Sequence, residues 1–288
     1  MDDNNSQKQQ SVDEKSTTGE LTEKIGRLRT RFLAEAESEP DKYHQIDIDR
    51  IRSDDWQLER FLIGHRDEDD EDSQMDKAYD ALARAMHWKQ TFGIHERQDR
   101  YFPREFLEFT KTQCFGRDRE GRLIQWEKVC NHRSIGEMSA VTKQFIGHLM
   151  EKTDREVGRH GFILVSDTQG SGLGNIDTDQ FRFKIELTQY YPEALQLILN
   201  VDLPWLLKGV SKVILSFCDQ RLKDRTRFIS RKELTDYIPA DIIPVDMDGE
   251  RDPKYVIPDC MLPMKQLSHL GFPDKAMQKY YKSFGQTF

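Results

Sequence analysis

The glycine-rich segment Gln169–Gly174 is the first candidate for binding chemistry, because glycines that follow a strand let backbone N–H groups approach a phosphate closely. Its three glycines alternate with other residues, whereas a dinucleotide-binding loop requires GxGxxG and a P-loop ends in Lys followed by Ser or Thr. Ser171 is not in a nucleophile elbow either, because Gln169 stands where the first glycine of that motif belongs. We therefore predict a turn here, with no cofactor and no catalytic serine.

The other reactive residues do not form a metal site or a catalytic set. The acidic run Asp67–Asp72 lacks the glycine and the closing glutamate of an EF-hand loop, so we interpret it as solvated charge that caps a helix. The three histidines nearest one another in sequence, His65, His87 and His95, have no i, i+4 pair of the kind that binds zinc on a helix. The four cysteines form no CxxC pair; they are Cys114, Cys130, Cys218 and Cys260. The sequence thus predicts no enzyme, no bound metal and a reducing compartment.

Residues 204–217 form an apolar helical pattern that could meet a ligand. Lys208, Ser211 and Lys212 make a narrow polar strip at i, i+3 and i+4, and most of the remaining circumference is apolar. One interpretation is a core helix. The other is a movable lid over an apolar cavity, whose lysines contact anionic headgroups while its Trp, Leu and Phe side chains contact acyl chains.

Length and charge exclude further classes of function. The chain has 288 residues, enough for one large domain or two modest ones, and 43 Lys and Arg against 51 Asp and Glu give a net charge of −8. No global basic field is present for nucleic-acid phosphates, so nucleic acid is not an expected partner. The most apolar stretch, residues 194–218, is interrupted by polar residues and cannot supply the ~20 apolar residues of a membrane span. With no export signal at its start, the chain is predicted to be a cytoplasmic monomer that associates with membranes only transiently and peripherally.

The first third of the chain is predicted to be helical. Residues 1–19 hold Val12 as their single aliphatic residue beyond the initiator, so we expect a disordered tail. A helical lobe follows over residues 20–95, with apolar residues at helical spacing in three segments, 21–36, 53–62 and 73–93.

Strands begin after residue 102 and alternate with helices. A hairpin is predicted over residues 111–129, and short apolar runs then predict strands at 161–166, 195–201 and 227–230, with helices at 138–157, 177–190 and 204–217. Such alternation indicates right-handed βαβ crossovers and a mostly parallel sheet. The predicted α/β domain covers residues 96–249. A proline-punctuated extension, 250–288, has one predicted helix at 274–284.

Six segments, in order and spacing, resemble the CRAL-TRIO family of lipid-binding and phosphatidylinositol-transfer proteins over residues 56–244. They are Leu58–Arg66, Trp88–Gly93, Gly116–Leu123, Val165–Gly170, Tyr190–Glu193 and Asn200–Trp205. The resemblance implies a helical N-terminal lobe followed by an α/β domain whose sheet, flanked by helices, floors a lipid pocket. It also implies a gating helix, which residues 204–217 match.

The resemblance assigns a lipid-headgroup site as well. In phosphatidylinositol binders of this family the headgroup meets a basic pair after the first motif, the Glu of the Tyr-Pro-Glu motif and a basic residue before the strand that follows the gate. The corresponding residues are His65, Arg66, Glu193 and Arg225, with Arg227 as an alternative to Arg225. A guanidinium can bind phosphate through a fork of donors, and a carboxylate can accept inositol hydroxyls. The other interpretation of Arg66 and Glu193 is a structural ion pair between lobes.

The pocket and gate assigned in the same way are largely apolar. They comprise Phe162, Leu164, Trp205, Leu206, Val210, Val213, Ile214 and Phe217, with Lys208 and Lys212 as membrane contacts. Phe162 and Leu164 stand where relatives that also take phosphatidylcholine have hydroxyl residues, which predicts an apolar floor. Leu222 replaces a threonine near the inositol site, and Asp248–Gly249 replaces a Gly-Gly pair.

These observations leave three functions open. The first is a carrier that binds one phospholipid, phosphatidylinositol above all, and exchanges or presents it at membranes. The second is a carrier of another small hydrophobic molecule, such as a tocopherol or a retinoid. The third is a regulatory scaffold whose extension, residues 250–288, docks a partner and whose pocket is vestigial.

Overall fold

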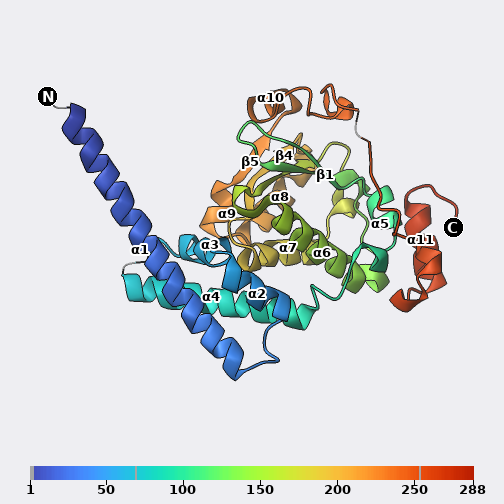
Figure 1. The fold of residues 1–288 in the computed structure, drawn as a ribbon. Helices are drawn as coiled ribbons and strands as arrows, with labels where there is room; N and C mark the ends of the chain where they lie inside the picture. Colours follow the sequence, from blue (N-terminus) through green and yellow to red (C-terminus); the bar gives the residue numbers. More distant parts are fainter. Residues whose placement is uncertain (1–2, 69, 253) are drawn as a thin grey trace. The chain divides into compact units, whose positions relative to one another are not determined.

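The computed structural model describes residues 3–68, 70–252 and 254–288, and it describes no side chains before residue 19. The chain divides into two compact units, residues 1–95 and 96–288. The first unit is helical (Figure 1), with α1 (Asp3–Ser38), α2 (Gln45–Ser53), α3 (Trp56–Gly64) and α4 (Glu71–Phe92). The structure describes almost no side chains of the predicted tail, residues 1–19. The disorder of this tail therefore stays a prediction.

The helices of the first unit share an apolar core. Leu28, Phe32, Leu58 and Leu82, from α1, α3 and α4, are fully buried. The acidic run serves the start of α4, because the Asp70 side chain accepts a hydrogen bond from the Ser73 N–H at 2.8 Å. The interpretation of this run as a helix cap is confirmed.

The second unit is built on one mixed sheet. Within its described residues, five strands are ordered β1-β2-β3-β4-β5. They are β1 (Gln113–Arg117), β2 (Leu123–Lys128), β3 (Phe162–Asp167), β4 (Leu195–Val201) and β5 (Thr226–Ile229). The β1–β2 hairpin is antiparallel and the other neighbours are parallel. This arrangement confirms the predicted α/β class with a mostly parallel sheet.

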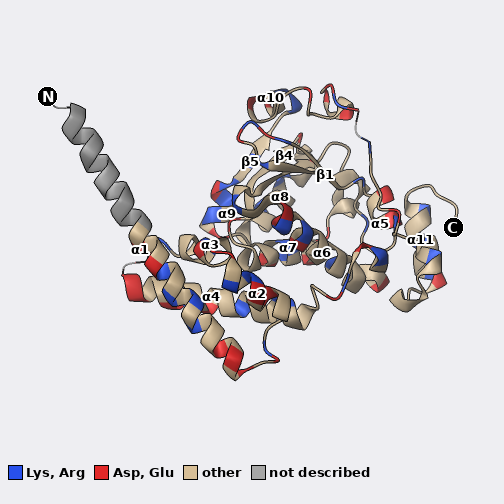
Figure 2. Cartoon of the chain, in the orientation of Figure 1, with Lys and Arg blue, Asp and Glu red and all other residues tan. Residues whose placement is uncertain are grey.

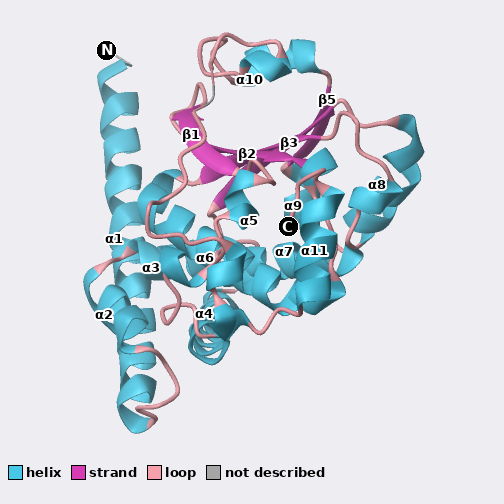
Figure 3. Cartoon of the chain, turned by 90° about the vertical axis from the view of Figure 1, so that its right-hand side faces the viewer, coloured by secondary structure: helices cyan, strands magenta, loops and turns pink. Residues whose placement is uncertain are grey.

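The longer helices of this unit lie on one side of the sheet, and α10 lies on the other (Figure 3). Because each parallel strand pairs with the next one in the chain, right-handed crossovers place the connecting helices on the same face. The helices are α5 (Glu105–Glu108), α6 (Ser139–Val157), α7 (Thr178–Tyr190), α8 (Lys208–Ser216), α9 (Gln220–Asp224), α10 (Leu234–Tyr237) and α11 (Asp274–Ser283). The 3-10 helix η6 (Trp205–Leu207) leads into α8.

The two faces of the sheet carry different side chains, because successive residues of a strand point in opposite directions. Ile163 and Val165 of β3 are fully buried in a core with Leu199 of β4 and with Leu234 and Ile238 from the α10 segment. The alternate residues of β3, Phe162 and Leu164, face the side of α6 and α7, where they line a cavity. The solid core and the hollow region therefore lie on opposite faces.

The backbone at Asp248–Gly249 explains why this pair can replace the Gly-Gly pair of the family pattern. Asp248 has a left-handed backbone with φ of 63°, a conformation that aspartate tolerates better than most residues. At Gly249 no side chain fits, because a Cβ there would lie 2.1 Å from the Ile243 carbonyl oxygen. The second position therefore requires glycine, whereas the first does not.

Residues 254–288 pack onto the second unit rather than projecting from it. Met277 and Tyr280 of α11 are buried with Phe106 and Phe145 in one apolar cluster. The buried Glu105 carboxylate accepts hydrogen bonds from the Met264 N–H, at 2.9 Å to Oε2, and from the Tyr281 hydroxyl. The extension is thus part of the packed domain.

Candidate functional site

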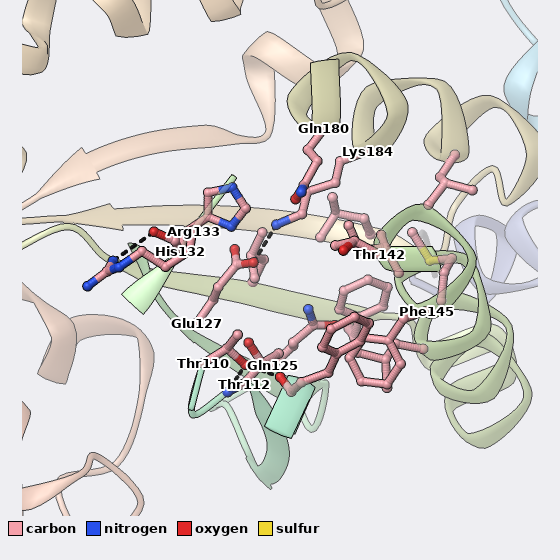
Figure 4. Close-up of a pocket in the computed structure, with 18 of the residues that line it drawn as sticks. Thr110, Thr112, Gln125, Glu127, His132, Arg133, Thr142, Phe145, Gln180 and Lys184 are labelled. Carbon is pink, nitrogen blue, oxygen red and sulfur yellow. Dashed lines mark hydrogen bonds and ion pairs between the residues drawn. The ribbon is translucent and has the colours of Figure 1, made fainter. Parts of the chain in front are cut away.

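Two cavities lie between the sheet and the helices on its open face. The first has a volume of about 130 Å³ and is lined by Phe162, Leu164, Phe145 and Leu149, with Tyr280 of the extension at its wall. Figure 4 shows it between β2, α6 and α7. The second has a volume of about 150 Å³ and lies between the sheet and α8. Both volumes far exceed the space that one water molecule needs, so this face is not filled by the protein's own side chains.

An ion pair marks the place where the two cavities meet. Glu127 of β2 accepts a hydrogen bond from the Lys184 ammonium of α7, and both residues line both cavities. A third, smaller hollow of about 50 Å³ is lined by the same pair. Burial alone would raise the pKa of Glu127, but the charge and hydrogen bond of Lys184 outweigh it and lower that pKa. The carboxylate form of Glu127 is therefore favoured.

His132 lies beside this ion pair (Figure 4). Burial and the Lys184 charge lower its pKa, so the imidazole is neutral at pH 7. Its Nε2 atom is buried and has no hydrogen-bond partner among the described residues. A buried polar atom without a partner is uncommon in folded proteins.

The gating segment has two faces. Val210 and Ile214, together with the buried Leu207, line the second cavity. Trp205 and Val213 are 80% and 52% exposed.

The remaining predicted gate residues also have exposed side chains. Leu206 and Phe217 are exposed, as are Lys208 and Lys212. The Phe217 ring lies under the Arg182 guanidinium of α7, 4.5 Å from its carbon. Of the predicted pocket and gate residues, Phe162, Leu164, Val210 and Ile214 therefore line the hollow, and the others form an outward apolar surface.

Glu193 sits in a cluster of arginines near the start of β4. Arg221 Nη1 donates to its Oε1 at 2.9 Å and Arg225 Nη2 to its Oε2 at 2.5 Å, and Glu193 is only 9% exposed. Figure 2 shows the basic residues of α9. Glu193 also has a left-handed backbone, with φ of 61°. Non-glycine residues rarely adopt this conformation, and it tends to occur at functional sites.

The other predicted headgroup residues have other hydrogen-bond or ion-pair partners. The Arg227 guanidinium donates to the backbone carbonyls of Asp224 and Thr226, and its register partner is the core residue Leu199. The structure therefore brings Arg225, rather than Arg227, to Glu193. His65 and Arg66 lie at the end of α3 in the N-terminal unit, 4.0 Å from Glu68 and 3.9 Å from Asp67.

The floor of the first cavity carries polar residues beside the predicted apolar ones. Phe162 and Leu164 do line the hollow, but β2 contributes Gln125 and Glu127 to the same floor. The missed signal was the alternation of β2, in which Ile124 and Trp126 are buried in the core and the polar residues between them must face the other way. Lys184 and Arg221 were missed because no local pattern distinguishes a helix lysine or arginine that points inward.

The comparisons with known proteins agree with this geometry. Residues 109–249 match the model of the CRAL/TRIO domain. A CRAL-TRIO domain-containing protein of Schizosaccharomyces pombe is 23% identical over 199 residues, which cover 64% of this chain and 44% of that protein. The chain thus spans less than half the length of this curated relative. The crystal structure of Sfh5 has the same fold, with a TM-score of 0.61 at 12% identity over 91% of this chain and 96% of that one.

Proposed function

From the premise that this chain carries a CRAL/TRIO domain over residues 109–249, we propose that it binds one phospholipid, preferably phosphatidylinositol, and exchanges or presents it at membranes. The observation that carries this proposal is the pair of largely apolar cavities between the sheet and its helices. Exposing an acyl chain to water costs about 0.8 kcal/mol per methylene, so a lipid with ~30 methylenes faces more than about 20 kcal/mol. A protein that encloses the tails removes this cost, and no bond is made or broken.

The gating segment supports exchange at a membrane. No residue of α8 is fully buried, and its inward residues Val210 and Ile214 line the second cavity, so movement of this helix would open that cavity. Its outward residues, Trp205 and Val213, are the kind that enter the headgroup region of a bilayer, and Lys208 and Lys212 suit anionic lipids. Within the described residues no helix is long and apolar enough to cross a bilayer.

The Glu193 cluster supports the headgroup assignment. One carboxylate between two guanidiniums leaves a net positive charge that attracts a phosphate. The carboxylate can also accept inositol hydroxyls, which choline lacks. The family resemblance also assigns His65 and Arg66, in the first unit, to headgroup binding.

The test of this function is lipid extraction and vesicle-to-vesicle transfer with purified protein. We expect phosphatidylinositol in the extract and its transfer between vesicles, with Arg225→Met reducing transfer roughly tenfold because about 1–3 kcal/mol of charged hydrogen bonding is lost. Arg227→Met is the matched control and should transfer at the wild-type rate. An empty protein with no transfer would contradict the proposal. Intact binding of a different hydrophobe in Arg66→Ala and Glu193→Ala would favour a carrier of a tocopherol-like or retinoid-like ligand.

The outward face of the gate gives a second prediction. Val213→Asp should weaken binding to anionic vesicles roughly tenfold, because it replaces an apolar membrane contact with a charge that the bilayer surface repels. Val256→Asp is the control, since Val256 is also exposed, at 80%, but lies outside the gate. Co-sedimentation with vesicles measures both. Equal binding of the two variants would remove α8 from the membrane contact.

A further inference from the structure

The Glu127–Lys184 pair is half-buried and lies in lining that the cavities share. The two cavities and the small hollow are all lined by both of its members. Phe162, Leu164 and Leu195 of the neighbouring strands provide apolar surface around it. Partly buried charges lose some of their solvation, and the net contribution of such ion pairs to stability is commonly small. Stability alone therefore does not account for it.

Further polar groups surround the pair on the side of the small hollow. Gln180 of α7 and the segment around Thr110 and Thr112 line both the first cavity and this hollow. His132 lines both as well, and its Nε2 atom lacks a partner among the described residues. The junction thus offers an ammonium, an imidazole and amide and hydroxyl groups, whereas the cavities on either side are mainly apolar.

We propose that the bound ligand carries a hydrogen-bond-accepting oxygen group within its body, between two hydrocarbon parts, and that this group is held at Lys184 and His132. One hydrocarbon part fills the cavity beside α6 and the other fills the cavity beneath α8. The chemistry has two sources: the ester carbonyls that join the chains of a diacyl lipid, or a hydroxyl in the middle of a single chain. This inference rests on the proposed function, because it specifies which hydrophobic molecules the cavities accept.

The geometry supports this assignment in two ways. Lys184 has three ammonium donors, of which Glu127 takes one, so donors remain for a ligand oxygen. A neutral imidazole presents one donor and one acceptor nitrogen, so His132 Nε2 can hydrogen-bond either a carbonyl or a hydroxyl, according to its tautomer. Fully apolar ligands would leave these groups unpaired at the centre of the site, which disfavours such ligands.

The test uses two pairs of probes that differ only in the oxygen group. Dioleoyl phosphatidylinositol is compared with its diether analogue, and 12-hydroxystearate with stearate, by native mass spectrometry of the wild-type protein. We expect the wild type to prefer the ester or the hydroxyl member of at least one pair by about fivefold or more. The pair that shows the preference identifies the source of the oxygen.

The variant for this test is Glu127→Gln/Lys184→Met, which removes both charges together so that no single buried charge is left behind. It should show a smaller preference than the wild type, because the Lys184 donors are gone while His132 remains. Lys143→Met/Asp179→Asn is the matched control, because it removes an α6–α7 ion pair of 2.7 Å that lines none of the three hollows, and it should keep the wild-type preference. Circular dichroism confirms that both variants are folded.

The outcomes separate this inference from the proposed function. Binding of both members of each pair with equal affinity by the wild type would overturn the inference and leave a lipid carrier. A preference that keeps its wild-type size in the Glu127→Gln/Lys184→Met variant would also overturn it. Binding of none of the four probes would overturn the proposed function and the inference together.

Discussion

Removal of residues 274–288 should lower the free energy of unfolding by at least about 5 kcal/mol. Met277 and Tyr280 are buried in the cluster formed with Phe106 and Phe145, and loss of each large buried side chain costs about 2–5 kcal/mol. Domains of this kind are stable by only about 5–15 kcal/mol, so the truncated chain should be largely unfolded or aggregated. Thermal denaturation and size-exclusion chromatography measure this.

A pair of point variants keeps this prediction testable if the truncated chain does not express. Tyr280→Ala should lower the stability by about 3–5 kcal/mol, and Lys279→Ala, at an exposed neighbouring position, should leave it unchanged. Tyr280 also lines the first cavity, so lipid transfer by its variant should be measured alongside its stability. A truncated protein that folds and still transfers lipid but loses its cellular role would instead support the scaffold hypothesis, in which the extension docks a partner.

Leu164→Trp should abolish lipid binding without unfolding the protein. Leu164 lines both cavities, and a larger side chain there fills space that the tails need. Overpacking a solid core costs about 1–3 kcal/mol, but here the indole enters a hollow, so the cost in stability should be small. We expect at least about a hundredfold loss of transfer activity, measured with labelled lipid between vesicles.

The control for Leu164→Trp is the same substitution at Leu173, a residue of the loop after β3 that is 58% exposed. Leu173→Trp should transfer lipid normally and have the wild-type melting temperature. Normal transfer by folded Leu164→Trp would mean that the tails lie elsewhere.

The elements that could be predicted from the sequence are those with a strong local signal. The strand at residues 195–201 has the predicted ends, because buried apolar residues recur at every second position along it. The helix after Asp177 begins as expected, since the Asp177 side chain accepts hydrogen bonds from the backbone N–H groups of Asp179 and Gln180, each at 3.0 Å. The short helices α2, α5, α9 and α10 were not predicted. They have between four and nine residues, too few for a helical period to show.

The candidate site also contains residues that could be predicted from the sequence and residues that could not. The apolar lining at Phe162 and Leu164 follows from a strand that is hydrophobic on both faces, and the family resemblance marks Glu193 and Arg225. The partners that give these residues their chemistry come from distant parts of the chain: Lys184 reaches Glu127 across 57 positions, and Arg221 reaches Glu193 across 28. Only the folded arrangement determines such pairs.

The segregation of the sheet into a solid side and a hollow side has an evolutionary consequence. Substitutions at Phe162, Leu164 or Gln125 alter the space offered to a guest molecule, whereas Ile163, Val165 and Ile124, their neighbours in sequence, hold the domain together. Every second residue of a strand can therefore diverge between relatives with little penalty to folding. A scaffold organised in this way can acquire new cargo by single substitutions while its architecture persists.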